Sequence, residues 1–185
     1  MDAVALVSGG KDSIYSILEC ARRGWRVVAL ANLLPGGGLQ APDELDSHML
    51  QTVGHAALPA IAACMELPLI RRTTSGLALH SGLDYPSACV PPFDLIAPGG
   101  SISTDHHDEV EDLYALLCDV LALHPTITAV SVGAIASSYQ RLRVESVCAR
   151  LQLTPLAFLW QRDQVRRRTE LWSAFMVAAG CAVHR

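Results

Sequence analysis

Residues 3–13 read Ala3-Val4-Ala5-Leu6-Val7-Ser8-Gly9-Gly10-Lys11-Asp12-Ser13. The first five form a continuous apolar run, which is typical of a strand buried on both faces of a parallel sheet. The paired glycines that follow predict a tight turn. Apolar residues then recur at helical spacing from Ile14 to Ala21, and Gly24 is the expected C-cap. The stretch therefore predicts a strand, a turn and a helix in immediate succession.

The same alternation of strands and helices continues along the chain. Further strands are predicted at residues 27–31, 67–70, 128–132 and 156–159. Helices are predicted at residues 47–65, 110–120, 139–151 and 171–177, and Gly54 and Pro59 leave the start of the first one open. This order predicts a single α/β domain over residues 1–185, a doubly wound, Rossmann-like parallel sheet of about five strands with helices on both faces. Ligands of such sheets bind beyond the carboxyl ends of the strands.

One long segment lacks a clear pattern. Residues 73–105 are rich in glycine, proline and serine. A segment of this length in a compact domain is usually a lid, a binding loop or a disordered insertion.

Composition narrows the class of protein. The net charge of −4 gives the domain no basic footprint for nucleic acid, and the basic run at residues 162–168 is typical of a solvated helix face. The six cysteines are scattered without a C-x-x-C pair, which favours a reduced cytoplasmic protein without disulfides or zinc. Neither a signal peptide nor an apolar run long enough to cross a membrane is present in the sequence, so we expect a soluble protein without a membrane partner.

The turn at residues 8–13 has the chemistry of a phosphate site. Gly9 and Gly10 allow backbone N–H groups to approach a ligand, and the helix N-terminus behind them attracts anions. Lys11 adds positive charge, Ser8 and Ser13 add hydroxyls, and Asp12 could hold a Mg²⁺ that bridges phosphates. Neither the Walker A spacing nor the G-x-G-x-x-G dinucleotide spacing is present. The alternative is a plain strand-to-helix turn.

Ser8-Gly9-Gly10-Lys11-Asp12-Ser13 resembles the PP-loop, the pyrophosphate-binding signature of N-type ATP pyrophosphatases of the HUP class. Eight further segments resemble the diphthine–ammonia ligase family in the same order. They are ALANL at 29–33, DELDS at 43–47, QTVGH at 51–55, LPLIRR at 67–72, EVEDL at 109–113, SVGAI at 131–135, SYQRLRVE at 138–145 and LWQRDQ at 159–164. The resemblance reaches about residue 164 and is interrupted by a variable loop at 75–103. Residues 165–185, which include the expected last helix, diverge from the family, so the chain resembles a C-terminally shortened member.

The resemblance implies roles for individual residues. Lys11, Asp12, Arg141 and Arg143 are the implied catalytic residues, with Mg²⁺ on Asp12. ATP is expected to lie against Ser8, Gly9, Gly10, Lys11, Asp12, Ser13, Ala31, Leu33 and Gly133. The implied substrate residues are Glu109, Asp112, Tyr139, Gln140, Trp160 and Arg162.

Several of these residues have a structural alternative. Glu109, Glu111 and Asp112 could only complement a helix dipole. Gly133 could be a strand-end turn, and Trp160 could belong to the core. Arg141 and Arg143 lie two positions apart on a helix and so face different ways, which leaves one or both for solvent.

Two adjacent histidines, His106 and His107, are candidates for metal ligands. His106-His107-Asp108 has no further ligand set at matching spacing, and adjacent side chains point apart. An exposed start of a helix is the favoured interpretation.

The resemblance implies an ATP-dependent amide-forming ligase. ATP would activate the carboxylate of diphthine on translation elongation factor 2, and ammonia would attack the acyl-adenylate, with AMP and pyrophosphate released. Three alternatives stay open: a sulfur-transfer enzyme acting on tRNA, a glutamine-fed amidotransferase, and a nucleotide-binding remnant without catalysis. A sulfur-transfer enzyme is expected to need a reactive cysteine at the ligand-binding edge of the sheet, and Cys89 is the only cysteine in an apparent loop. A glutamine-fed amidotransferase is expected to need an N-terminal cysteine or a glutaminase domain.

Overall fold

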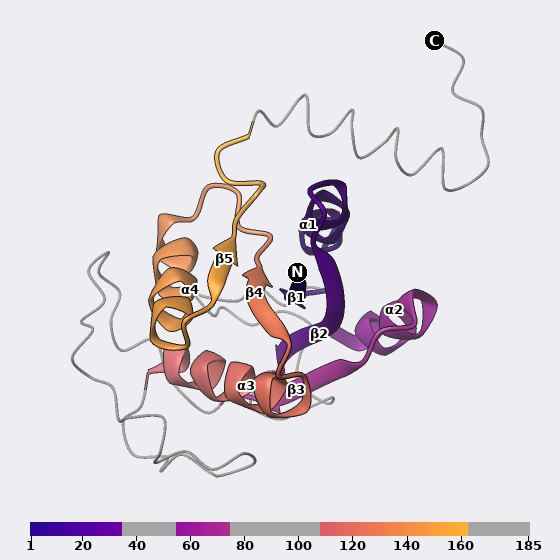
Figure 1. Ribbon diagram of the computed structural model, residues 1–185, viewed down its shortest axis with the longest axis horizontal. Coiled ribbons are helices and arrows are strands. Elements are labelled where there is room, and N and C mark those ends of the chain that lie inside the picture. The colour runs from indigo at the N-terminus through magenta and orange to yellow at the C-terminus, as the bar shows by residue number, and fades with distance from the viewer. Residues whose placement is uncertain (35–54, 75–107, 163–185) are drawn as a thin grey trace.

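The computed structural model describes residues 1–34, 55–74 and 108–162. They form one parallel sheet of five strands in the order β3-β2-β1-β4-β5 (Figure 1). The strands are β1 (Asp2–Leu6), β2 (Arg26–Leu34), β3 (Leu69–Thr73), β4 (Ile127–Ser131) and β5 (Thr154–Leu156). The helices are α1 (Lys11–Arg22), α2 (Leu58–Met65), α3 (Glu109–Leu123) and α4 (Ser138–Arg150), and a 3-10 turn η2 (His55–Ala57) precedes α2. The predicted α/β sheet is confirmed.

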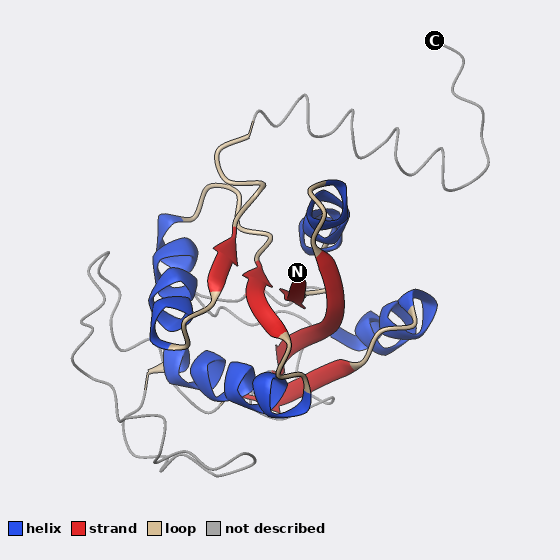
Figure 2. Ribbon diagram, viewed as in Figure 1, coloured by secondary structure: helices blue, strands red, loops and turns tan. Residues whose placement is uncertain are grey.

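The helices cover both faces of the sheet (Figure 2). Val4 and Leu6 of β1 pack in one core cluster with residues of α3 and α4. Ala5 and Val7 point to the opposite face and pack with residues of α1 and α2. This alternation explains why β1 is apolar at every position after Asp2, since a strand covered on both sides has no solvent face.

The strand order places a topological switch at the centre of the sheet. The chain adds β2 and β3 on one side of β1, then returns to add β4 and β5 on the other side. The loops that leave β1 and β4 therefore diverge, and they open a crevice at the carboxyl ends of these two strands.

Helix α1 ends one residue earlier than the sequence suggested. Arg23 is the C-cap, and Gly24 follows it with a φ of 79°. The Gly24 N–H donates to the carbonyl of Ala21 and the Trp25 N–H to that of Cys20. Glycine is thus needed directly after the cap, where the backbone turns left-handed.

The predicted bounds of two strands were wrong. A strand was expected at 67–70, but the Leu67 N–H closes the end of α2 on the Ala62 carbonyl, after Glu66 has turned left-handed at φ 54°. Pairing with β2 therefore starts only at Leu69. A strand was also expected at 156–159, but β5 is Thr154–Leu156, and the apolar residues after it form turns that bury Leu159.

Some expectations fall outside the described residues. These are the first part of the helix expected at 47–65, the variable loop at 75–103, the pair His106-His107 and the helix expected at 171–177. Within the described part, α2 begins at Leu58 with Pro59 in its first turn, where a missing N–H costs nothing. Of the helices in the described ranges, none is long and apolar enough to cross a membrane.

The amino ends of β1 and β2 are joined by an exposed ion pair that should titrate in acid. Arg26 donates Nε and Nη2 to the Asp2 carboxylate, each at 2.9 Å, and this pairing lowers the pKa of Asp2 from 3.8 to about 2. Because the folded-state pKa is depressed, the stabilisation is present above about pH 4 and is lost as the pH falls through 2. We expect Asp2→Asn to lower the urea midpoint at pH 5, and the difference from wild type to shrink as the pH falls through 2. A difference that grows in acid would contradict this assignment.

Candidate functional site

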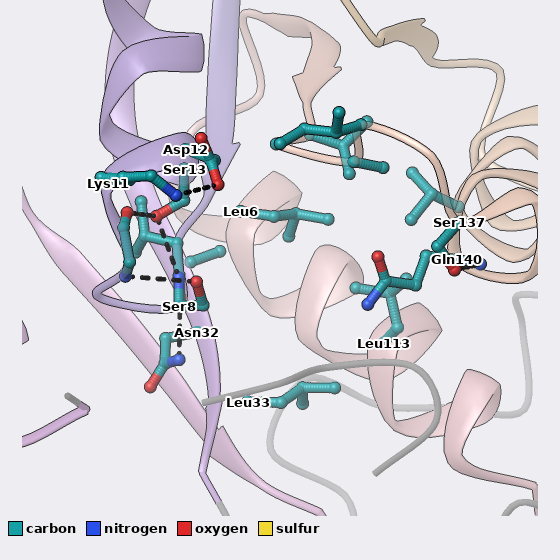
Figure 3. Close-up of a pocket in the computed structure, with 18 of the residues that line it drawn as sticks. Leu6, Ser8, Lys11, Asp12, Ser13, Asn32, Leu33, Leu113, Ser137 and Gln140 are labelled. Carbon is teal, nitrogen blue, oxygen red and sulfur yellow. Dashed lines mark hydrogen bonds and ion pairs between the residues drawn. The ribbon is translucent and has the colours of Figure 1, made fainter. Parts of the chain in front are cut away.

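A cavity of about 470 Å³ lies at the carboxyl ends of β1 and β4, at the switch point of the sheet (Figure 3). The turn after β1 and the start of α1 form one wall, and β2 contributes residues 31–33. The opposite wall comes from Leu113 and Leu116 of α3 and from residues 132–137 after β4, with Gln140 and Val144 of α4. The cavity is therefore built by segments that lie far apart in the sequence.

The serines of the turn after β1 hold it in shape. Ser13 donates its hydroxyl to the Gly10 carbonyl at 2.8 Å, while the Ser8 N–H donates to Ser13 Oγ and the Gly10 N–H to Ser8 Oγ, both at 3.4 Å. Gly9 has a φ of 84°, a conformation that favours glycine. The turn is thus a defined cradle rather than a passive connection.

The N-terminus of α1 faces the cavity without a capping side chain. Its N-cap is Gly10, which has no side chain to accept from the first-turn N–H groups, and residues 10–13 line the cavity. Uncapped N–H groups and the positive end of the helix dipole together make an anion site. This end of α1 can hold phosphate groups.

Lys11 and Asp12 place opposite charges at the mouth of this site. The Lys11 side chain is 72% exposed and its Nζ lies 2.9 Å from Asp12 Oδ2. Asp12 Oδ1 is buried without a hydrogen-bond partner in the structure. An exposed lysine can swing toward a ligand, and a buried carboxylate oxygen of this kind suits a cation or a donor brought in by the ligand.

Gly133 touches the backbone of α1. A Cβ at this position would lie 2.9 Å from both Cα and N of Ser13, and 3.1 Å from the Asp12 carbonyl carbon. Only glycine allows the loop after β4 to approach the turn after β1 so closely. The position is therefore more than a strand-end turn.

The cavity brings together most of the residues expected to bind ATP. Ser8, Gly10, Lys11, Asp12, Ser13, Ala31, Leu33 and Gly133 line it, and so does Gln140 from the expected substrate set. Gly9 lies within the turn but is absent from the lining.

The acidic residues at the start of α3 are buried and paired. Asp112 Oδ2 accepts from the Thr74 hydroxyl at 2.7 Å, and Glu109 Oε1 lies 3.5 Å from the Tyr139 hydroxyl. Glu111 accepts two hydrogen bonds from Arg150, both at 2.9 Å. These carboxylates are bound within the fold and lie outside the cavity lining, so they do more than complement a helix dipole.

Asp108 also corrects an expectation. The start of this helix was expected to be exposed, but Asp108 is buried and caps α3 by accepting from the Val110 N–H at 3.0 Å. It lies near Tyr139, where burial, above all, raises the pKa of the phenol, and the charges of Glu109 and Asp108 add to the rise. Among described residues, no three His, Cys, Asp or Glu side chains are grouped to hold a metal ion.

Arg141 and Arg143 face different ways, as their spacing predicts. Arg143 is fully buried, with its guanidinium 3.2 Å from the centroid of the Tyr139 ring. Arg141 is partly exposed, donates to Glu145 at 2.5 Å and lies 4.9 Å from the Trp160 ring. Neither arginine lines the cavity, and Trp160 stacks with Arg141 outside it.

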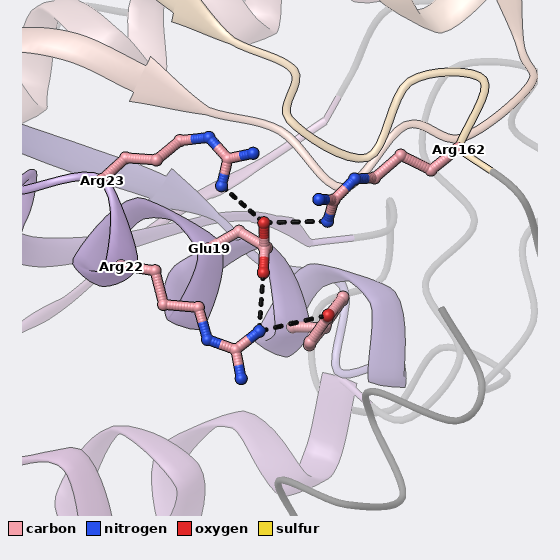
Figure 4. Close-up of polar contacts among 5 residues, drawn as sticks. Glu19, Arg22, Arg23 and Arg162 are labelled. Atoms are coloured by element: carbon pink, nitrogen blue, oxygen red, sulfur yellow. Dashed lines mark hydrogen bonds and ion pairs between the residues drawn. The ribbon is translucent and has the colours of Figure 1, made fainter. Parts of the chain in front are cut away.

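Arg162 reaches α1 instead of the cavity (Figure 4). Its Nη1 donates to Glu19 Oε2 at 2.8 Å, and Arg22 and Arg23 donate to the same carboxylate at 2.8 and 2.6 Å. Burial alone would raise the pKa of Glu19, but these hydrogen bonds and the charge of Arg162 hold it below its ordinary value. The cluster ties the segment after β5 to α1.

The sequence analysis missed some cavity residues. Asn32 of β2 and Ser137, the N-cap of α4, supply the polar groups, and Leu113, Leu116 and Val144 supply apolar surface. The available signal was Asn32 itself, since an amide within the apolar run of a buried strand requires a partner.

The chain is similar in sequence to several curated proteins. No protein-family model matches it. A diphthine–ammonia ligase of Danio rerio is 49% identical over 175 residues, which cover 94% of this chain and 61% of that protein. The diphthine–ammonia ligase of Homo sapiens is 47% identical, covering 89% of this chain and 55% of that protein, and that of Saccharomyces cerevisiae is 40% identical, covering 92% and 22%.

Among solved structures, a predicted subunit of tRNA methyltransferase from Methanocaldococcus jannaschii is similar, with a TM-score of 0.43 and 15% identity, covering 93% of this chain and 74% of that one. The chain spans between 22% and 61% of the length of the curated relatives named above. Over 89–94% of its own length, the chain is homologous to diphthine–ammonia ligases.

Proposed function

We propose that the chain catalyses the ATP-dependent amidation of diphthine on translation elongation factor 2. The diphthine carboxylate would attack the α-phosphorus of ATP and release pyrophosphate. Ammonia would then attack the acyl carbon of the adenylate, lose a proton and release AMP, leaving the amide. The observation that carries this proposal is the cavity in which the uncapped N-terminus of α1 meets Gly133 after β4. The names of the related diphthine–ammonia ligases support diphthine and ammonia as substrates.

The phosphate end of ATP fits the α1 side of the cavity. The first-turn N–H groups of α1 and the Lys11 ammonium would hold the pyrophosphate and stabilise the negative charge that develops as it leaves. The serine hydroxyls already fix the backbone of the turn, so little ordering is left to occur on binding. The nucleoside would extend toward Ala31, Leu33 and Gly133.

A Mg²⁺ ion fits Asp12. The buried Oδ1 atom of Asp12 is an acceptor without a hydrogen-bond partner in the structure, and Mg²⁺ that accompanies a nucleotide needs only one or two protein carboxylates. When bound, the ion would neutralise phosphate charge. Asp12 itself would orient the phosphates through this contact.

The substrate carboxylate has fewer candidates in reach. Gln140 lines the cavity and can donate a hydrogen bond from its amide. Arg141 is the candidate for pairing with the carboxylate, because its guanidinium is partly exposed beside Trp160. Arg143, which is buried against Tyr139, would act by holding Tyr139 near Glu109, and Asp112 would help fix this end of α3. Arg162 would have to leave Glu19 to meet substrate.

The described cysteines give no support to a sulfur-transfer reaction. Cys20, Cys118 and Cys148 are buried, and burial raises the pKa of all three thiols, that of Cys148 to about 12. A high pKa suppresses the reactive thiolate. Cys64, the exposed one, lies on α2 outside the cavity lining, whereas Cys89 lies outside the described residues. Ammonia is therefore the favoured nucleophile, and the scattered free thiols favour a cytoplasmic setting.

The proposal is tested by pyrophosphate release from Mg²⁺·ATP with ammonium and elongation factor 2 that carries diphthine. We expect release to require both the factor and ammonium. Lys11→Ala should reduce it about 10-fold or more, because the only lysine of the chain would be lost from the phosphate site. Arg26→Ala removes an exposed cation at the opposite end of the strands and should leave the rate unchanged.

Lys11 also offers a binding test that does not depend on turnover. It is the only lysine in the sequence, so an amine-reactive reagent can modify only this side chain and the N-terminus. ATP should protect Lys11 from modification. Protection without pyrophosphate release under any combination of substrates would favour the nucleotide-binding alternative over the ligase.

A further inference from the structure

Asn32 is a buried amide at the point where β1 separates from β2. The pairing of these strands ends at Leu6 and Ala31, and the Val7 N–H still donates to the Ala31 carbonyl at 2.9 Å. Beyond this point β2 stays paired with β3 as far as Leu34, while β1 turns away into the phosphate turn. Asn32 lies in this fork and is 3% exposed.

The side chain of Asn32 takes the place of a sheet hydrogen bond. Its Nδ2 donates to the Val7 carbonyl at 2.9 Å (Figure 3). A carbonyl can only accept, so this contact fixes which end of the amide is the nitrogen. Since Ser8, the first residue of the phosphate turn, directly follows Val7, the contact sets the point from which the turn departs.

The other end of the amide argues against a role in stability alone. Asn32 Oδ1 is buried and has no hydrogen-bond partner in the structure, which costs free energy. Leucine has nearly the shape of asparagine, and Leu30, which points to the same face of β2 as Asn32, belongs to an apolar core cluster. A leucine at this position would remove the unsatisfied oxygen but would also take the Nδ2 donor from the Val7 carbonyl, so its two effects on stability oppose each other.

We propose that Asn32 is a positioning residue of the nucleotide site. Through the Val7 carbonyl it holds the start of the turn at Ser8, so that the N–H groups of α1 meet the phosphates. Its effect on ATP rests on the proposed function, but its effect on the turn does not. Sequence periodicity alone would assign the position to the core.

The test uses Asn32→Leu with the affinity for Mg²⁺·ATP and the hydrogen exchange of residues 3–13 as readouts. We expect at least a 10-fold loss of affinity and faster exchange in the turn without nucleotide, while the midpoint of thermal unfolding changes little. Ser131→Ala is the matched control, because it removes a buried hydrogen bond of 3.2 Å between Ser131 of β4 and Ser16 of α1, and neither residue lines the cavity. It should bind ATP as wild type does.

The outcomes separate the two proposals. Wild-type affinity and wild-type exchange in Asn32→Leu would overturn the role of Asn32 and leave the ligase proposal intact. Faster exchange in a protein whose wild type binds no ATP would support the role of Asn32 and refute the nucleotide function. Asn32→Ala adds no atoms to the fork and repeats the test should the leucine variant not fold.

Discussion

Replacing Gly133 by alanine is expected to weaken the binding of Mg²⁺·ATP about 10- to 100-fold. The new Cβ would lie 2.9 Å from Cα and N of Ser13, well inside van der Waals contact. Both atoms belong to backbone at the start of α1, so the clash cannot be relieved by rotating a side chain. Forced backbone shifts of this kind cost about 1–3 kcal/mol, and each 1.4 kcal/mol of lost binding energy is a factor of ten. Titration calorimetry with ATP measures the effect directly.

Gly24→Ala provides the control for this prediction. Gly24 lies at the other end of α1 with a φ of 79°, and no atom lies within 4 Å of the Cβ position. Alanine there should lower stability by about 1 kcal/mol through backbone strain and leave ATP affinity unchanged. Equal losses of affinity in both variants would mean that general destabilisation, rather than the contact between Gly133 and Ser13, explains the result.

Local patterns explain why much of the fold was predictable from the sequence. The β1–turn–α1 unit rests on an apolar run, two glycines and a helical repeat, all within about twenty residues. The limits of β3 and β5 depended on contacts that a local sequence pattern does not show. Because Glu66 turns left-handed and Leu67 closes the end of α2, β3 starts later in the chain than its apolar residues suggest. The apolar pattern after Leu156 fits a strand or a buried turn equally well, and the burial of Leu159 in the core is what distinguishes them.

In the candidate site, too, the residues set by local sequence were predictable, and those set by tertiary contacts were not. The turn after β1 was predictable because its residues are contiguous, whereas Gly133 was selected through the family resemblance and not through a local pattern. Arg143 and Arg162 were expected near ligands, yet Arg143 packs on Tyr139 and Arg162 pairs with Glu19. Glu19 and Arg162 lie 143 positions apart, so no periodicity could pair them. Charged residues can be selected from a sequence as candidates, but tertiary contacts decide which of them face a cavity.

Glu19→Gln is expected to lower the free energy of unfolding by about 2 kcal/mol at neutral pH. The Glu19 side chain is 2% exposed and accepts from three guanidinium groups, those of Arg22, Arg23 and Arg162. Hydrogen bonds to charged groups each contribute about 1.5–3 kcal/mol. The total is expected to stay near the low end because the three arginines are partly exposed and can recover hydration once the carboxylate is neutral. Urea denaturation of both proteins measures the difference.

The pH dependence of that difference identifies charge as its cause. The pKa of Glu19 is held below its ordinary value of 4.5, so its contribution is complete above that pH and is lost as the pH falls through the folded-state pKa. The gap between wild type and Glu19→Gln should therefore narrow in acid, whereas a gap of constant size would point to altered packing by the amide. Arg26→Ala, which breaks an exposed pair, should lower stability less than Glu19→Gln does. Arg162 follows β5, and Glu19 lies on α1, whose N-terminus lines the cavity. Loosening this cluster would therefore also increase hydrogen exchange at residues 157–162 before global unfolding.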